Sequence, residues 1–486
     1  MTGRTPRILI VGSGFAGIGM AIALRRRGLT DLVILERAET LGGTWRDNRY
    51  PGCACDVESV LYSFSFEPNP EWSRTFSPQP EIEAYLQRVA ETSGVLPFVR
   101  FGEEVTGATW DEATHRWCVT STSGTWQAEH LVVATGALSD PVPPAIPGLD
   151  TFAGPTFHTA AWDATVPLDG RRVAIIGTGA SAIQAIPALQ PRVAHLTVAQ
   201  RTPAWVMPRW DRATPAWRRA LYRRLPVTQR LARLLQYLRH ETLFVPFRHA
   251  GPRRLAEWII GWHLRRQVRD PELRRRLTPP YGIGCKRLLL SDAYYPAMTQ
   301  SNVSLVTDAI VRIRPEGLET ADGRTHAADV LILATGFRPT DPPLAPVIRG
   351  RDGRSLADVW RGSPAAYLGT TVAGFPNLFL LNGPGTGLGH SSVLMMFEAQ
   401  FAHVLGVLDL LARRNARTAE PTAAAQAAYV RWLDAAHADT VWSRGGCRSW
   451  YLDSTGRNAA LWPHGVGRFR RMTRRVRPDD YALDLT

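Results

Sequence analysis

The pattern of apolar positions predicts two copies of one strand–turn–helix–strand unit. Residues 7–36 read as an apolar strand, a glycine-rich turn, a helix and a second apolar strand. Residues 172–201 repeat this order in register. Two further apolar strands, in segments 131–141 and 330–342, each run into Ala-Thr-Gly. Strands that alternate with helices favour parallel sheets, so we predict an α/β fold with two Rossmann-like dinucleotide-binding domains.

The turns and the strand ends indicate which dinucleotide each unit binds. Gly12 permits a tight turn, Gly14 lets the backbone approach a pyrophosphate, and Gly17 lets the helix pack on the strand. Glu36 ends the second strand and can accept hydrogen bonds from both ribose hydroxyls, which predicts FAD in the first unit. Arg201 stands at the matching place in the second unit and suits a 2′-phosphate, which predicts NADPH there.

The order of the segments predicts that the FAD-binding domain is discontinuous. Residues 1–145 would form its first part, residues 146–336 an inserted NADPH-binding domain, and residues 337–486 its second part with a C-terminal segment. In that second part, residues 374–400 read as a strand and a Gly-rich turn that enters a helix, which would place backbone N–H groups near the flavin ring. Residues from about 205 to 280 read as a helical insert in the NADPH-binding domain.

The charge of the chain is concentrated in this insert. The 486 residues carry a net charge of +14, yet residues 201–280 contain nineteen arginines against five acidic residues, and the remainder balances. A general affinity for nucleic acid is therefore not indicated. The insert alternates Arg with Leu, Trp, Tyr and Phe, as basic amphipathic helices do. We expect their arginine faces to be solvated, with a weak contact to a membrane surface or to an acidic partner as the alternative.

The cysteines and the N-terminus bear on the compartment. The five cysteines are odd in number and scattered apart from one Cys-x-Cys pair, without metal-ligand spacing. We therefore expect reduced thiols, no metal site and a cytoplasmic location. No export signal is visible. The uncharged run 8–24 divides into a strand, a glycine turn and a helix, so we expect no transmembrane segment.

The segment between the two units carries residues that neither unit explains. Its aromatic, glycine and polar positions are spaced unlike a strand or an amphipathic helix. These positions are Phe152, Gly154, His158, Trp162 and Asp163.

With these residues the chain resembles the type I Baeyer–Villiger monooxygenases of the flavin monooxygenase superfamily. The linker matches the family pattern FxGxxxHxxxW(P/D) in full, and GGTWRDNRYPGCACD at residues 42–56 matches a second family pattern. The resemblance covers nearly the whole chain. It implies that NADPH reduces FAD, that O2 adds at flavin C4a, and that the peroxyflavin converts a ketone to an ester or lactone. His158 and Trp162 would couple rotation of the NADPH-binding domain to flavin reduction.

The same resemblance assigns roles near the flavin. The family's catalytic arginine, in a Lys-Arg pair upstream of Tyr-Tyr, falls at Arg287, and Asp56 would be its counter-charge. Such chemistry needs a fixed cation beside a developing negative charge in a water-poor pocket. Lys286, the one lysine among 56 arginines, would contact the 2′-phosphate or ribose of NADP. The tryptophan that the family places against the nicotinamide nucleotide falls at Trp450.

The predicted cofactor-binding residues come from both turns, from the strand ends and from these motifs. They are Gly12, Ser13, Gly14, Gly17, Glu36, Thr44, Trp45, Asp56, Tyr62, Val105, Gly177, Thr178, Gly179, Ala180, Ser181, Ala182, Gln184, Gln200, Arg201, Lys286, Arg287 and Trp450.

Other functions remain open at this point. A flavin-dependent S- or N-oxygenase uses a protonated hydroperoxide and would not need an arginine paired with Asp56. A pyridine nucleotide disulfide reductase needs a CxxxxC pair after the first unit, whereas Cys53 and Cys55 are too close for an unstrained bridge. A membrane-surface or scaffold role of the insert would be additional to catalysis. The insert and the C-terminal segment would line the substrate pocket, and their apolar residues suggest a large apolar ketone.

Overall fold

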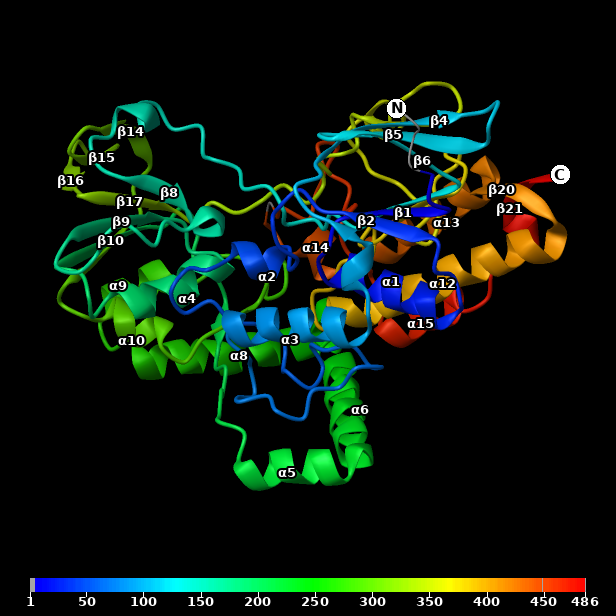
Figure 1. The fold of residues 1–486 in the computed structure, drawn as a ribbon. Helices are drawn as coiled ribbons and strands as arrows, with labels where there is room; N and C mark the ends of the chain where they lie inside the picture. Colours follow the sequence, from blue (N-terminus) through cyan, green and yellow to red (C-terminus); the bar gives the residue numbers. More distant parts are fainter. Residues whose placement is uncertain (1–4, 448, 486) are drawn as a thin grey trace.

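The structure is a computed structural model that describes residues 5–447 and 449–485. Two parallel sheets lie in separate lobes that stand side by side (Figure 1). The predicted α/β fold with two Rossmann-like units is confirmed. Strands β1 and β7 of the first sheet and β17 of the second are buried over their full length, as in parallel sheets covered by helices on both faces.

The first sheet has the strand order β19-β7-β1-β2-β3, and all its neighbours are parallel. Its last strand comes from far along the chain, so one sheet joins the N-terminal part to residues after 370. The strands are β1 (Ile8–Val11), β2 (Leu32–Leu35), β3 (Val99–Arg100), β7 (His130–Val133) and β19 (Leu378–Leu380).

Helices α1 (Phe15–Arg26) and α12 (Val393–Arg414) pack on each other below this sheet, and α15 (Val466–Thr473) packs on α12. Among the described helices, α12 alone is long and apolar enough to cross a membrane, and most of it is buried inside the protein. The remaining elements of this lobe are α2 (Thr44–Asp47), α3 (Gln79–Thr92), β4 (Val105–Asp111), β5 (Arg116–Ser121), β6 (Gly124–Ala128), β18 (Ile348–Arg349), α11 (Leu356–Trp360), β20 (Ala416–Pro421), α13 (Ala423–His437), α14 (Val441–Arg444) and β21 (Tyr481–Leu485).

The second sheet has the strand order β13-β10-β9-β17-β8 and is also parallel. Its strands are β8 (Thr156–His158), β9 (Arg172–Ile176), β10 (His195–Ala199), β13 (Val303–Val306) and β17 (Val330–Leu333). Around it lie α4 (Ala180–Leu189), α10 (Tyr294–Met298) and a hairpin sheet of β14 (Ile310–Arg314), β15 (Gly317–Thr320) and β16 (Thr325–Ala327).

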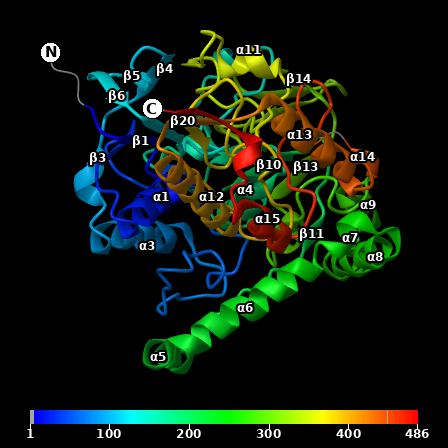
Figure 2. The same cartoon turned by 90° about the vertical axis from the view of Figure 1, so that its right-hand side faces the viewer.

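The Arg-rich insert is helical, as predicted, and lies between β10 and β13 of the second sheet. Figure 2 shows α5 and α6 as an arm that projects from the body. The elements of the insert are β11 (Val206–Met207), α5 (Ala216–Arg224), α6 (Pro226–Thr242), α7 (Val245–Arg248), α8 (Ala250–Gln267) and α9 (Pro271–Leu277). After the insert, β12 (Leu289–Leu290) pairs with β11.

One expectation about the linker is wrong. Its spacing was unlike a strand, yet Thr156–His158 forms β8, the edge strand of the second sheet, and pairs with β17. The strand is only three residues long, and it forms because β17 offers it an edge. Such pairing is a tertiary effect that a local pattern does not contain.

The expectation of five reduced thiols is also wrong. Cys285 and Cys447, 162 residues apart in sequence, form a disulfide, whereas Cys53, Cys55 and Cys118 are free. The fold brings the two Cα atoms to 6.1 Å, within the usual range for a disulfide.

Candidate functional site

The first glycine turn lies at the carboxyl end of β1, where dinucleotides bind in such sheets. Gly17 shows why the turn needs glycine, because a Cβ there would lie 1.9 Å from the carbonyl oxygen of Gly12. Gly14 precedes α1 and accepts the first backbone bond of that helix, from Ile18. The first turn of α1 therefore directs backbone N–H groups to the carboxyl edge of the sheet.

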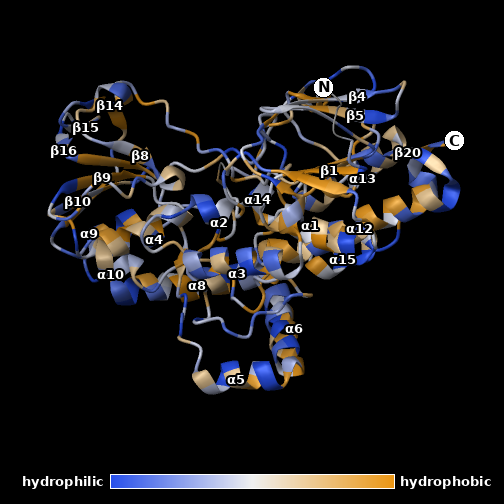
Figure 3. Ribbon diagram, in the orientation of Figure 1, coloured by the Kyte–Doolittle hydropathy of each residue, from blue (hydrophilic) through white to orange (hydrophobic). Residues whose placement is uncertain are grey.

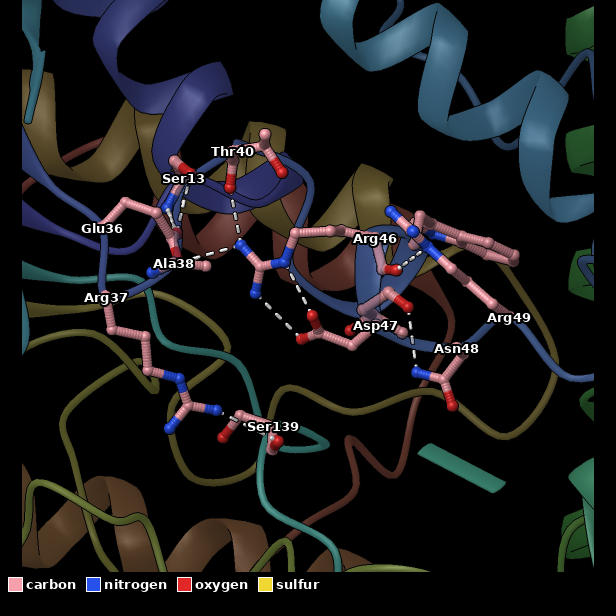
Figure 4. A network of polar contacts seen from close by, with 12 residues as sticks. Ser13, Glu36, Arg37, Ala38, Thr40, Arg46, Asp47, Asn48, Arg49 and Ser139 are labelled. Atoms are coloured by element: carbon pink, nitrogen blue, oxygen red, sulfur yellow. Dashed lines mark hydrogen bonds and ion pairs between the residues drawn. The ribbon is translucent and has the colours of Figure 1, made fainter. Parts of the chain in front are cut away.

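Glu36 follows β2 and holds this turn in place (Figure 4). Its carboxylate is 4% exposed and accepts hydrogen bonds from the backbone N (2.9 Å) and the Oγ (2.7 Å) of Ser13, and from the backbone N of Ala38 (3.0 Å). Burial would raise the pKa of Glu36, but these hydrogen bonds, together with the charge of Arg46, outweigh burial and lower it. Glu36 is therefore ionised at neutral pH.

Arg46 is a residue of this site that the sequence reasoning missed. Its Nη1 donates to Glu36 Oε1 at 2.9 Å, and its Nε and Nη2 donate to Asp47 at 2.7 and 3.0 Å (Figure 4). With this bond, Glu36 has four donors from the protein, two of them backbone. A ribose hydroxyl that binds Glu36 must therefore replace Ser13 Oγ or Arg46 Nη1. The signal for Arg46 was its place inside the GGTWRDN motif, one residue after Trp45.

The GGTW segment packs directly on the first turn. Gly42 donates its backbone N–H to the carbonyl of Ser13 (3.2 Å), and a Cβ on Gly43 would lie 3.3 Å from Gly14 Cα. Further along, Trp45 donates from Nε1 to the hydroxyl of Tyr62 at 2.9 Å. The segment thus covers the turn with backbone and with a bonded aromatic pair.

Two other predicted residues of the first lobe differ in exposure. Thr44 is exposed at the start of α2. Val105 is buried and packs in one core cluster with Val11 and Leu35, at the carboxyl ends of β1 and β2.

The second turn repeats this geometry between β9 and α4. Gly179 precedes α4, and a Cβ there would meet open space, so the start of the helix is accessible. Thr178 is buried, and its Oγ1 donates to the carbonyl of Thr202 at 3.2 Å. Ala182 is fully buried at the place that Gly17 takes in the first unit. The other predicted residues here are Gly177, Ala180, Ser181 and Gln184.

Gln184 joins the two lobes. Its Oε1 accepts from the hydroxyl of Tyr50 (3.0 Å) and from the backbone N of Ala54 (3.3 Å), and its Nε2 donates to the carbonyl of Ala54 (3.0 Å). In addition, Arg209 of the insert donates from Nη2 to the carbonyl of Cys55 at 2.9 Å. Residues 50–56 are therefore held both by α4 and by the insert.

Arg201 and Lys286 form a pair of cations without a matching acid. Arg201 is exposed just after β10, and Lys286 Nζ lies 5.3 Å from the ring centroid of Tyr281. Burial and then the charge of Arg201 lower the pKa of Lys286. Within the described residues neither cation forms an ion pair with a carboxylate. Gln200 beside them is buried, and its Oε1 has no hydrogen-bond partner in the described chain. The two cations could bind an anion, and Gln200 Oε1 could accept a hydrogen bond from a polar group next to that anion.

Arg287 and Asp56 form an ion pair between the lobes, although 231 residues separate them in sequence. Nε and Nη2 of Arg287 donate to Asp56 Oδ2 at 2.9 and 2.6 Å. The side chains are 32% and 23% exposed, so the pair is partly accessible. The charge of Asp56 raises the pKa of Arg287 further above its usual value, against burial, so the guanidinium stays charged. The other N–H groups of the guanidinium remain for another acceptor.

The C-terminal segment closes over the Arg287 loop. The disulfide joins the residue before Lys286 to Cys447, and Gly282 donates its backbone N–H to the carbonyl of Gly445 at 3.0 Å. Tyr451 is buried, and the charge of Arg287 partly offsets the burial that raises the pKa of Tyr451 to about 12. The sequence reasoning missed Tyr451 and the disulfide. Trp450, which it chose, is 42% exposed and lies against Tyr451, with the ring centroids 4.4 Å apart.

The linker residues hold positions at the edge of the second sheet. His158 is buried, its Nδ1 accepts from the backbone N of Ala160 at 3.1 Å, and its ring packs edge-on against Phe337. Burial lowers the pKa of His158, so it is neutral at neutral pH. Trp162 packs edge-on against Phe157 at 5.0 Å.

The remaining linker residues have simpler surroundings. A Cβ on Gly154 would lie 2.2 Å from the carbonyl oxygen of Asp329. Phe152 is partly buried against core residues of the second lobe, such as Leu331 and Leu333. Exposed Asp163 accepts from the backbone N and Oγ1 of Thr165 at 2.9 and 2.5 Å. The linker therefore belongs structurally to the second lobe.

Two other features remain. A cavity of about 360 Å³ adjoins the loop before Lys286, because Tyr281 and Gly282 line it together with residues of the insert and Arg444 and Gly445 of the C-terminal segment. One group of possible metal ligands occurs in the described chain, namely Glu112, His115 and Asp484, and Arg351 already pairs with Glu112.

Known proteins resemble this chain over its whole length. A family model described as "Pyridine nucleotide-disulphide oxidoreductase" matches residues 9–217, which include both glycine turns. A protein of Streptomyces coelicolor named "Baeyer-Villiger monooxygenase" is 50% identical over 479 residues, 98% of this chain and 92% of that protein.

Two solved structures are similar in fold. Cyclohexanone monooxygenase from Rhodococcus sp. Phi1 bound to NADP+ has a TM-score of 0.88 and 30% identity and covers all of both chains. A complex of the protein OTEMO with FAD and NADP has a TM-score of 0.89 and 28% identity, and covers 99% of this chain and 100% of the other.

Proposed function

Because the chain belongs to the type I Baeyer–Villiger monooxygenases, we propose that it converts a ketone to an ester or lactone with FAD as cofactor and with NADPH and O2 as co-substrates. The observation that carries this proposal is the Arg287–Asp56 ion pair, held between two lobes that each carry a dinucleotide turn. FAD supplies the centre at which O2 is activated, and NADPH supplies its electrons.

The residues of the first lobe fit FAD. The backbone N–H groups at the start of α1 suit its pyrophosphate, and ionised Glu36 suits the ribose. The Gly-rich turn before α12 holds Ser391, whose buried Oγ has no hydrogen-bond partner in the described residues and could bond the flavin. We propose that residues 1–145 and 337–486 form the FAD-binding domain.

The residues of the second lobe fit NADPH. The accessible start of α4 suits the pyrophosphate, and Arg201 with Lys286 suits the 2′-phosphate because both cations lack an acid partner among the described residues. We propose residues 146–336 as the NADPH-binding domain. His158 and Trp162 would transmit movements of this domain. His158 packs against Phe337, where the chain returns to the first lobe, and Trp162 packs against Phe157 of the edge strand β8.

Arg287 has the role that the reaction requires of a cation. Negative charge develops on the transferred oxygen and on the carbonyl oxygen of the ketone, and a fixed guanidinium stabilises both. Asp56 holds two of its N–H groups, which orients the plane of the guanidinium and leaves the others for those oxygens. We assign Arg287 as the catalytic residue and Asp56 as a residue that positions it.

The alternatives are less well supported. A heteroatom oxygenase needs no such cation, and the relative from Streptomyces coelicolor is not named as one. A disulfide reductase is not supported, although the family model has that description, because Cys53 and Cys55 are both free and buried. The size of the ketone and the cytoplasmic location stay predictions from the sequence.

The test combines cofactor and product. The purified yellow protein should lose its flavin absorbance on anaerobic addition of NADPH and regain it in air. With isotope-labelled O2 and a panel of cyclic and linear ketones, mass spectrometry should find an ester or lactone that contains one labelled oxygen atom. Oxidation of a thioether with no ester from any ketone would favour the heteroatom oxygenase and contradict the proposal.

A further inference from the structure

The helical insert exposes an unusual number of large apolar side chains. Of the nineteen that are exposed in the described chain, fourteen lie between Trp210 and Trp262. Scattered single apolar residues on a surface need no explanation, but a concentration of them marks a contact surface. Figure 3 shows apolar residues along α6, in the arm that projects from the body.

Helix α6 has its polar face turned inward. Gln229 is buried and donates from Nε2 to the carbonyl of Asn69 at 2.6 Å. One helical turn later, Arg233 donates from Nη1 to the carbonyls of Val60 and Ser63, both at 2.9 Å. Near the end of the helix, buried His240 Nε2 lies 2.6 Å from Glu58 Oε2. These contacts fix the rotation of the helix about its axis.

The opposite face of α6 is apolar and exposed. It consists of Val227, Leu231, Leu234, Leu235 and Leu238, which are 49–66% exposed and follow the spacing of one helical face. A surface helix of a globular protein normally turns its apolar stripe to the core and its polar residues to water. Here the polar contacts hold the apolar stripe outward, so the stripe serves a partner outside the chain.

A second helix of the insert presents the same kind of surface. In α8, Leu255, Trp258, Ile259 and Trp262 are 49–63% exposed at helical spacing. Tryptophan is enriched at the boundary between membrane and water, where its ring is partly apolar and partly polar. The composition of both helices therefore suits a bilayer interface.

The charge decides what kind of partner fits. The arm, residues 216–242, contains seven arginines and one acidic residue, Glu241. Exposed arginines lie on both helices of the arm, with Arg224 on α5 and Arg230 and Arg239 on α6, which carries the apolar stripe. A second copy of this chain would bring two such arginine-rich surfaces together, and like charges repel. Acidic lipid headgroups above an apolar interior match both features.

We propose that the arm and α8 bind the surface of an anionic lipid bilayer, with the leucine stripe of α6 inserted between the headgroups. The contact is peripheral, because the one described helix able to cross a membrane, α12, is mostly buried in the core. This inference is independent of the catalytic proposal, since it rests on the arm and α8 alone.

The experiment measures co-sedimentation of the FAD-loaded full chain with vesicles. We expect binding to vesicles of phosphatidylglycerol and phosphatidylcholine, weaker binding as salt is added, and little binding to phosphatidylcholine alone. The variant Leu231→Gln/Leu235→Gln should bind at least about tenfold more weakly, because two apolar side chains no longer enter the bilayer. The matched control Val311→Gln/Leu485→Gln, which changes two exposed apolar residues elsewhere, should bind like the wild type.

Folding is checked separately. Because Leu231 and Leu235 are more than half exposed, the variant should keep its flavin absorbance and its melting temperature. Three results would overturn the proposal: no sedimentation with anionic vesicles, equal sedimentation of the α6 variant, or a dimer in light scattering that the α6 variant abolishes in a protein that ignores vesicles. The last result would make a second copy the partner.

Discussion

The two cations Arg201 and Lys286 give the sharpest prediction about the cofactor. We expect Arg201→Ala and Lys286→Ala to raise the KM for NADPH strongly and to leave the KM for NADH nearly unchanged. The physical reason is that both cations lack an acid partner in the described structure, and that burial and the charge of Arg201 lower the pKa of Lys286. The 2′-phosphate of NADPH, bound between the two cations, would relieve this repulsion, whereas NADH has no 2′-phosphate.

The size of the effect follows from the bonds lost. A hydrogen bond to a charged group contributes about 1.5–3 kcal/mol, and each 1.4 kcal/mol corresponds to about a tenfold change in affinity. Each single variant should therefore lose about tenfold to a hundredfold in NADPH affinity. The double variant should lose less than the sum, because removing either cation also removes its repulsion on the other.

The assay is steady-state oxidation of NADPH and of NADH, with Arg324→Ala, an exposed arginine of the same lobe, as the control. The pH dependence gives a second readout. Because the pKa of Lys286 is lowered, its charge is lost sooner as pH rises, so NADPH affinity should fall with rising pH while NADH affinity stays flat. An unchanged preference for NADPH over NADH in Arg201→Ala would refute the assignment of the phosphate site.

Three other changes test the fold and the FAD site. Gly154→Ala should cost about 1–3 kcal/mol of stability and lower the melting temperature, because its Cβ would lie 2.2 Å from a carbonyl oxygen. The control Gly251→Ala in α8, where a Cβ meets open space, should not destabilise the protein, and equal melting temperatures of the two variants would contradict this. Reduction of the disulfide, or Cys285→Ser, should lower the melting temperature. The bond to Cys447 spans 162 residues of sequence, and closing a loop of that length restricts the unfolded chain and stabilises the folded state by up to about 5 kcal/mol in the chain-entropy account. A melting curve that does not respond to reductant would contradict this prediction. Glu36→Gln should weaken FAD retention in gel filtration at neutral pH, and full flavin content in the variant would contradict the role of Glu36. In the wild type, the stability that Glu36 contributes should be complete above the ordinary pKa of a glutamate and be lost as pH falls through the lowered pKa of Glu36.

The two nucleotide units could be predicted from the sequence because their determinants are local. A glycine such as Gly17 is required by contacts within its own turn, and Glu36 binds Ser13 only 23 residues away. The Arg287–Asp56 pair spans 231 residues, so no local pattern contains it, and it was predicted only through the family resemblance. The structure now gives that pair a geometry.

What could not be predicted depends on tertiary packing. The disulfide joins Cys285 to a residue 162 positions away, and scattered cysteines do not reveal such a pairing. The bond between Arg46 and Glu36 could not be predicted, because it depends on how the segment after β2 folds back toward the end of that strand. The rotation of α6 was also hidden, because an amphipathic helix predicts an apolar face inward, and buried polar partners such as Asn69 and Glu58 reverse it.

The central claim is that Arg287, oriented by Asp56, stabilises the negative charge that develops during oxygen transfer to a ketone. The most direct measurement is the yield of ester or lactone per NADPH oxidised by Arg287→Ala, with flavin content and flavin reduction rate measured on the same sample. Loss of a fixed charge donor should lower the rate of ester formation by about a hundredfold to a thousandfold. Flavin content should stay at the wild-type level, and the electrons from NADPH should reduce O2 to hydrogen peroxide, with one H2O2 formed per NADPH oxidised. A wild-type yield of ester per NADPH from this variant would contradict the account.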